Sequence, residues 1–173
     1  MEEKKPITHI VAGLLIAALI VLFAIITNFL GLTENRGIGM IQYVIIIGGL
    51  IFFVNQYGKA NNYYIGFGDL FAYGFKSTAV FTCIYVIFIV AFFLIFPDIK
   101  EKSLEIARHQ MEQNGKLSES DIDRGVEMAR KFFWVGVVGG SIIFLIIVGA
   151  IGSLIGAAVT KKRPHNPLEQ LNA

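Results

Sequence analysis

Charged residues are scarce in this sequence, and four long segments contain none. They make up 16% of the chain, whereas a typical soluble domain has about 25%. No Asp, Glu, Lys or Arg occurs in residues 10–32, 38–54, 77–96 or 132–160, where apolar residues dominate. An uncharged apolar run of about 18 residues or more is the usual signal of a membrane-spanning helix. The sequence therefore excludes a soluble globular protein and predicts an all-α integral membrane protein, a four-helix transmembrane bundle.

Residues that commonly perform catalysis or bind metals are also few. Cys83 is the one cysteine and lies inside an uncharged run, so no intrachain disulfide can form. His9, His109 and His165 fall in three separate segments, which argues against a metal site. Serine-hydrolase, zinc-protease and complete phosphate-loop motifs are absent from the sequence. We therefore expect neither an enzyme nor a cofactor or metal site, and no nucleic-acid partner.

The span interiors lack the ionisable residues that ion-coupled carriers and proton relays usually place in a membrane. Their polar side chains are more typical of hydrogen bonds between helices, each worth about 0.6 kcal/mol. This pattern disfavours a proton- or sodium-coupled transporter but is compatible with passive transport of a small neutral solute. The pore of such a transporter would lie on an oligomer axis lined by Thr78, Thr82, Tyr85 or Ser141. The polar set is Asn28, Gln42, Asn55, Thr78, Thr82, Tyr85, Ser141 and Ser153.

The charges gather between the third and fourth spans. Residues 98–131 hold eight of the thirteen acidic and seven of the fifteen basic residues, with apolar positions at helical spacing. They predict an extramembrane helical hairpin that breaks at Asn114-Gly115, has Ser118 and Asp121 as an N-terminal cap, and continues unbroken into the fourth span. Pro97 should end the third span. We expect a single membrane domain, 1–173, with spans at about 8–32, 38–57, 69–96 and 132–160.

The placement of lysine and arginine indicates the topology. Four spans put both termini on one side of the membrane. Lys4 and Lys5 flank the start of the first span, whereas Arg36 alone follows its end, and a Lys-Lys-Arg tail at 161–163 follows the fourth span. Because short positively charged flanks favour the cytoplasm, we expect both termini there and the charged hairpin outside.

Glycines mark the fourth span. Gly136 and Gly140 form one G-x-x-x-G pair, and Gly152 and Gly156 form another. Small residues four apart let helix backbones approach closely in lipid. The two pairs are compatible with packing inside the bundle or with self-association.

The stretch YYIGFGDLFAYGFK, residues 63–76, begins the third span. Its Gly66-x-Gly68 pair fails as a dinucleotide-binding fingerprint, because Phe71 stands at the third-glycine position and no strand precedes it. Asp69 should lie in the first turn of the helix, where the dipole favours a negative charge, with Tyr73 able to bridge toward Asp69 or Lys76. Two interpretations stay open: an interfacial helix start with an aromatic belt, or a site for a lipid headgroup or small solute. The candidate residues are Gly66, Phe67, Gly68, Asp69, Phe71, Gly74 and Lys76.

These features carry a family resemblance. The sequence has F-G-x-x-F-x-x-G-F at 67–75, then Phe96-Pro97-Asp98, and I-G-S-L-I-G-A at 151–157 ahead of Lys161-Lys162. In this it resembles the bacterial family defined only as domain of unknown function 4199, whose members are small four-span membrane proteins. The resemblance implies a multi-pass protein of the bacterial inner membrane with this topology. It supplies no catalytic or binding residues.

The function that the sequence favours is a non-enzymatic accessory or scaffold subunit that acts through protein–protein contacts in the membrane. Its partners would be the lipid bilayer and either a second copy of the chain or another membrane protein. The alternative is a small oligomeric passive transporter or channel.

Overall fold

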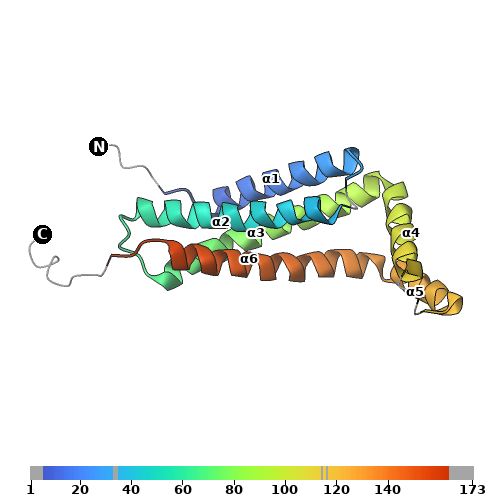
Figure 1. The fold of residues 1–173 in the computed structure, drawn as a ribbon. Coiled ribbons are helices and arrows are strands. Elements are labelled where there is room, and N and C mark those ends of the chain that lie inside the picture. The colour runs from blue at the N-terminus through green and yellow to red at the C-terminus, as the bar shows by residue number, and fades with distance from the viewer. Residues whose placement is uncertain (1–5, 33–34, 114, 116, 164–173) are drawn as a thin grey trace, which may run out of the picture. The chain divides into compact units, whose positions relative to one another are not determined.

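The computed structural model describes residues 6–32, 35–113, 115 and 117–163, and within them all regular structure is helical. The elements in order are α1 (His9–Phe29), α2 (Arg36–Ala60), α3 (Phe67–Ile95), α4 (Pro97–Gln113), α5 (Glu119–Lys131), the π-helix η1 (Val135–Gly139) and α6 (Gly140–Val159) (Figure 1). Four segments are long and apolar enough to cross a membrane: α1, residues 37–60 of α2, α3, and η1 with α6. The predicted all-α class is confirmed. Lys4, Lys5 and His165 lie outside the described residues.

Short polar residues begin the first two helices. The Thr8 hydroxyl accepts a hydrogen bond from the Val11 amide at 3.3 Å, and the Asn35 side chain accepts one from the Gly37 amide at 3.0 Å. These caps satisfy amides that have no partner within the helix. At the other end of α1, Gly31 has a φ of +67°, the left-handed conformation in which helices commonly end at glycine.

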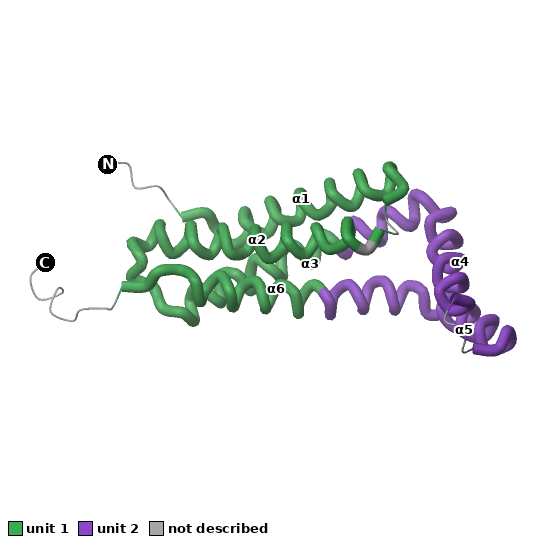
Figure 2. The backbone as a smooth tube through the Cα atoms, viewed as in Figure 1, with its two compact units in different colours: residues 1–85, 145–173 green, residues 86–144 purple. Residues whose placement is uncertain are grey.

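The chain forms two compact units (Figure 2). Unit 1 comprises residues 1–85 and 145–173, and unit 2 comprises residues 86–144. Unit 1 therefore holds α1, α2, the first part of α3 and the last part of α6. Its core is almost entirely aliphatic and aromatic, and it includes Ile16, Ile46, Leu50, Val54, Leu70, Phe81 and Leu145.

Apolar side chains also cover the outer faces of the long helices. Leu14, Leu22, Phe52 and Ile147 are each about half exposed or more. A helix that is apolar all round is typical of a membrane span, because lipid tails replace water as its surroundings.

Glycines allow the helices of unit 1 to approach closely. A Cβ atom on Gly152 would lie 2.8 Å from Leu50 Cδ1 and 3.3 Å from Ile47 Cα. A Cβ on Gly149 would overlap Thr78 Cγ2. Only a residue without a side chain fits at such positions, so glycine determines where these helices touch.

Most buried serine and threonine hydroxyls of unit 1 bond within their own helices, whereas Thr82 Oγ1 has no hydrogen-bond partner among the described residues. Thr78 donates to the Gly74 carbonyl at 3.1 Å, and Ser153 donates to the Gly149 carbonyl at 2.7 Å. The expectation that Thr78 and Ser153 form hydrogen bonds between helices is therefore wrong. A small residue that satisfies its hydroxyl locally can face a glycine on the next helix without needing a polar partner there.

In unit 2, α4 and α5 form the charged hairpin. Ser118 caps α5 as predicted, its hydroxyl accepting from the Asp121 amide at 3.3 Å, and Gly115 takes a φ of +61° in the turn. Pro97 opens α4, at the first helical position where its missing N–H costs nothing. The expected unbroken continuation into the fourth span is wrong, because α5 ends at Lys131 and Phe132 leaves helical geometry at φ −101° and ψ 16°.

Candidate functional site

The two G-x-x-x-G pairs of the fourth span have different surroundings. Gly152 and Gly156 pack against α2 in unit 1, where a Cβ on Gly156 would lie 3.3 Å from Ile51 Cα. Around Gly136 and Gly140 a Cβ would meet nothing within 4 Å, and the same holds for Gly139 between them. The second pair thus packs within the bundle, whereas the first leaves a strip of bare backbone uncovered.

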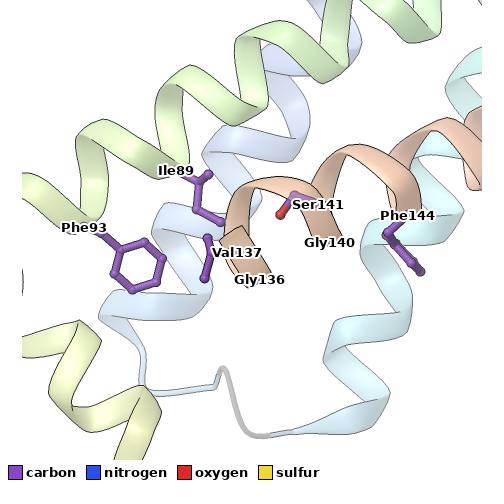
Figure 3. Close-up of a pocket in the computed structure, with 7 residues that line it drawn as sticks. All are labelled: Ile89, Phe93, Gly136, Val137, Gly140, Ser141 and Phe144. Atoms are coloured by element: carbon purple, nitrogen blue, oxygen red, sulfur yellow. The ribbon is translucent and has the colours of Figure 1, made fainter. Parts of the chain in front are cut away.

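This uncovered strip forms one side of an open apolar groove in unit 2. Ile89 and Phe93 of α3 face Val137 across the groove in Figure 3. Its volume is about 450 Å³, and it is widely open to the surroundings. Among its lining residues Ser141 alone has a polar side chain. The full lining is Ile89, Phe93, Gly136, Val137, Gly140, Ser141 and Phe144.

The π-helix contributes directly to this side of the groove. Residues 135–139 read V-G-V-V-G, and the wider i→i+5 turn inserts one extra residue into the helical repeat. The insertion changes which face of the span the following residues present. The glycines at 136 and 139 leave the widened backbone without side chains over it. Such single π turns are frequent at functional sites.

Aromatic packing supports the Phe93 side of the groove. The Phe93 ring meets the Phe133 ring edge-on, with centroids 5.1 Å apart, and the Trp134 ring at 6.3 Å. The Lys100 ammonium lies 5.2 Å from the centroid of the Phe133 ring, within the range of a cation–π interaction. Phe133 is buried. These contacts fix the position of Phe93 beside the groove.

The glycine-aromatic stretch at 63–76 lies elsewhere, in unit 1. Asp69 occupies the first turn of α3 as expected, and it is exposed. The predicted bridge by Tyr73 between Asp69 and Lys76 is wrong. Tyr73 is buried, its ring stacks on that of Tyr57 with centroids 4.1 Å apart, and its hydroxyl donates to the Ile7 carbonyl at 2.9 Å. Tyr73 therefore joins α3 to α2 and to the segment before α1.

The remaining candidates of this stretch do not converge on one pocket. Gly74 is buried, and a Cβ there would lie 2.7 Å from Ser153 Oγ. Phe71 is half-buried and stacks on Phe75, with centroids 5.7 Å apart. The others are exposed, namely Gly66, Phe67, Gly68, Asp69 and Lys76. The structure thus divides the stretch into a packing face and a surface face.

Sequence reasoning missed two sets of residues. Ile89 and Phe93 line the groove, but in an apolar run nothing distinguishes them from lipid-facing neighbours. The tail after α6 was interpreted only as a topology signal, yet it folds back onto the α2–α3 turn. The Arg163 amide donates to the Tyr63 carbonyl at 2.9 Å, and the Lys162 ammonium lies 5.6 Å from the Phe67 ring centroid. The available signals were the aromatic residues at 63–75 and the Lys-Lys-Arg run at 161–163, which the sequence places far apart.

Comparison with curated proteins finds no match, and comparison with solved structures finds none either. A family model does match, over residues 11–162, and it is described as "Protein of unknown function (DUF4199)". The matched range includes the four long apolar segments except the first two residues of α1, together with the charged hairpin and the groove. The chain therefore belongs to the DUF4199 family of proteins of unknown function.

Proposed function

We propose that this protein is a non-enzymatic accessory or scaffold subunit that receives a transmembrane helix of another integral membrane protein in the groove of unit 2. The observation that carries the proposal is the uncovered strip at Gly136, Gly139 and Gly140. In unit 1 the later glycines of the same span, Gly149, Gly152 and Gly156, pack against neighbouring helices of the same chain. The strip at the start of the fourth span is also rich in glycine. Among the described residues, however, no atom lies within 4 Å of the Cβ positions of these glycines.

The chemistry of the groove suits a helix. Association of helices in lipid depends on close van der Waals packing, since lipid tails are as apolar as the helices themselves. A strip of glycines lets a partner backbone approach closely, and Ile89 and Phe93 would enclose its side chains on the other side. The Ser141 hydroxyl could add a hydrogen bond to the partner, worth about 0.6 kcal/mol by analogy with other membrane helices.

The concave shape favours a different protein over a second copy of the chain. In a two-fold symmetric dimer the same surface patch must complement itself. The glycine strip alone could pair with its own copy, as G-x-x-x-G segments do in membrane dimers. The hollow beside it, lined by Ile89, Phe93 and Val137, would lose van der Waals contacts in such a dimer, whereas a helix from another protein would fill it.

Site-directed crosslinking tests the proposal. A photoreactive phenylalanine analogue at Val137, in the full chain in its native membrane, should give one discrete adduct with another integral membrane protein. Gly140→Leu should abolish the adduct, because its side chain would occupy the strip. Gly48→Leu is the matched control, since Gly48 on α2 is also exposed with nothing within 4 Å of its Cβ position, and its adduct should persist.

Two results would overturn the proposal. An adduct of unchanged yield in Gly140→Leu would show that the strip is not the contact surface. A crosslink only between two copies of the chain would assign the groove to self-association.

The alternative function, a small oligomeric passive transporter, has weaker support. A pore along an oligomer axis would need the polar residues of α3 at its surface, but Thr78 and Thr82 are only 1% and 5% exposed. Thr78 also packs against Gly149 inside unit 1. Solute flux into liposomes that contain the protein, if it changes in the Thr82→Val variant, would favour the transporter over the accessory subunit.

A further inference from the structure

Basic residues gather at one end of unit 1. Lys59 lies at the end of α2, Lys76 in the early part of α3, and residues 161–163, Lys-Lys-Arg, directly after α6. All are exposed. Figure 1 shows the end of α2, the start of α3 and the end of α6 at the same end of the molecule. The described part of this end has one carboxylate, that of Asp69.

Packing contacts place these segments next to one another. A Cβ on Gly58 would lie 2.5 Å from Thr160 Cγ2 and 3.4 Å from Leu70 Cδ2. Residues adjacent to Gly58 and Thr160, namely Lys59 and Lys161, therefore project from touching helix ends. The fold brings this cluster together, because Lys59 and Lys161 are about a hundred positions apart in the sequence.

The tail after α6 is held in a defined position. Its Arg163 amide donates to the carbonyl of Tyr63 at 2.9 Å. Tyr63 has a φ of +63°, a left-handed conformation that is rare for a bulky residue. The Arg163 guanidinium lies 5.7 Å from the Tyr64 ring centroid, and the Lys162 ammonium lies 5.6 Å from the Phe67 ring centroid. The two cations thus lie over aromatic rings at the ends of the spans.

The cluster has no anionic partner in the described part of the chain. The ion pairs there, with N···O distances up to 4.0 Å, all lie within α4 and α5 and use Glu101, Glu112 and Asp123. Like charges gathered without counter-charges repel one another, so an external anion would stabilise this arrangement.

We propose that this basic end of unit 1 binds the phosphate of an anionic phospholipid headgroup. The cations lie where membrane-spanning helices end, which is the level of the lipid phosphates. Phe67 and Val159, at these helix ends, are 43% and 60% exposed and offer an apolar surface to the acyl chains. Lys76 stands nine residues into α3, about 13 Å along its axis, so its side chain covers only part of the distance to the phosphate level and the contact with the phosphate falls to the other cations. This site is separate from the groove and does not depend on its function.

Lipid titration of the purified full chain in neutral detergent, read by native mass spectrometry, tests the proposal. Phosphatidylglycerol should bind more tightly than zwitterionic phosphatidylcholine. In a variant with Lys161→Gln, Lys162→Gln and Arg163→Gln its affinity should fall by about 100-fold at low salt, since each cation near an anionic surface contributes about fivefold. Arg163→Lys keeps the charge and the backbone hydrogen bond, and should bind within a few-fold of the wild type.

The matched control removes three cations from the hairpin, as Lys102→Gln, Arg124→Gln and Lys131→Gln. It has the same net charge as the first variant and should bind phosphatidylglycerol as the wild type does. Equal losses in the two triple variants would refute a local site and leave only a net-charge effect. Displacement of the lipid by millimolar inorganic phosphate would also refute the proposal, by identifying a soluble anion as the ligand. Phosphatidylcholine binding as tightly as phosphatidylglycerol would refute the charge-based recognition.

Discussion

Replacing Gly149 by alanine should destabilise unit 1, although alanine is the better helix former. The new Cβ would overlap Thr78 Cγ2 and lie 2.5 Å from Thr78 Oγ1. Rotation of the Thr78 side chain about χ1 gives little relief. Its Cβ carries two heavy atoms, Cγ2 and Oγ1, so after any rotation at least one of them still lies near the new Cβ. Its hydroxyl is also bonded to the Gly74 carbonyl at 3.1 Å. The helices must therefore move apart.

The magnitude follows from two opposing effects. Overpacking of a well-packed interior costs about 1–3 kcal/mol, and the exchange of glycine for alanine in a helix returns up to about 1 kcal/mol. We therefore expect the free energy of unfolding to fall by about 1–2 kcal/mol. Gly48→Ala is the matched control, because its Cβ would meet nothing within 4 Å, and it should leave the stability unchanged or slightly raised.

The assay is unfolding in mixed micelles by titration with SDS, followed by far-ultraviolet circular dichroism. A double-mutant cycle with Thr78→Ala isolates the contact. That substitution removes Cγ2 and Oγ1 and leaves Thr78 Cβ, 2.9 Å from the added carbon, so the rescue should be partial. Two results would refute the claim that glycine sets the distance between α3 and α6 here. One is a Gly149→Ala variant with wild-type stability, and the other is a double variant in which the two single losses of unfolding free energy simply add.

Three further predictions concern single contacts. Hydrogen bonds from Arg108 and, to a smaller extent, His109 lower the pKa of Glu112 below its usual 4.5. The stability that these hydrogen bonds contribute is therefore complete above about pH 4.5, and it is lost as the pH falls through the lowered pKa. An NMR titration should show this lowered midpoint and its return toward 4.5 in Arg108→Gln; an unchanged midpoint would contradict it. Ser118→Ala should cost about 1 kcal/mol at the start of α5, seen as faster amide exchange in its first turn, and equal exchange rates would count against the cap. Tyr73→Phe should lower the free energy of unfolding in SDS by about 1 kcal/mol through loss of the hydrogen bond to the Ile7 carbonyl, and an unchanged free energy would show that this bond contributes nothing.

The helices and several of their ends could be predicted from the sequence, because these depend on local chemistry. An uncharged run of about 20 residues must satisfy its backbone internally in lipid, and a helix does so without other segments. Ser118 caps α5 through an amide three residues away, and Pro97 affects the backbone only next to itself. The break at Phe132 was missed because no proline or glycine marks it.

The candidate sites could be predicted only in part. The glycines at 136, 140, 152 and 156 form two similar pairs in the sequence, yet one packs on α2 and the other borders an open groove. Their difference depends on which faces of other helices come near, and those faces belong to residues far away in the chain. Asp69 drew attention as a carboxylate, but it is exposed, and no polar groups of the described residues converge on it.

The sequence by itself determined that this is a multi-span helical membrane protein, where several of its helices begin, and which family it belongs to. The tertiary structure alone decided that Tyr73 stacks on Tyr57, that Gly149 meets Thr78, and that the tail at Arg163 bonds to Tyr63. The physical reason is the range of the interactions. Hydrophobicity and helical hydrogen bonds act within a few residues, whereas a contact between helices depends on the shapes of two surfaces that the sequence specifies separately.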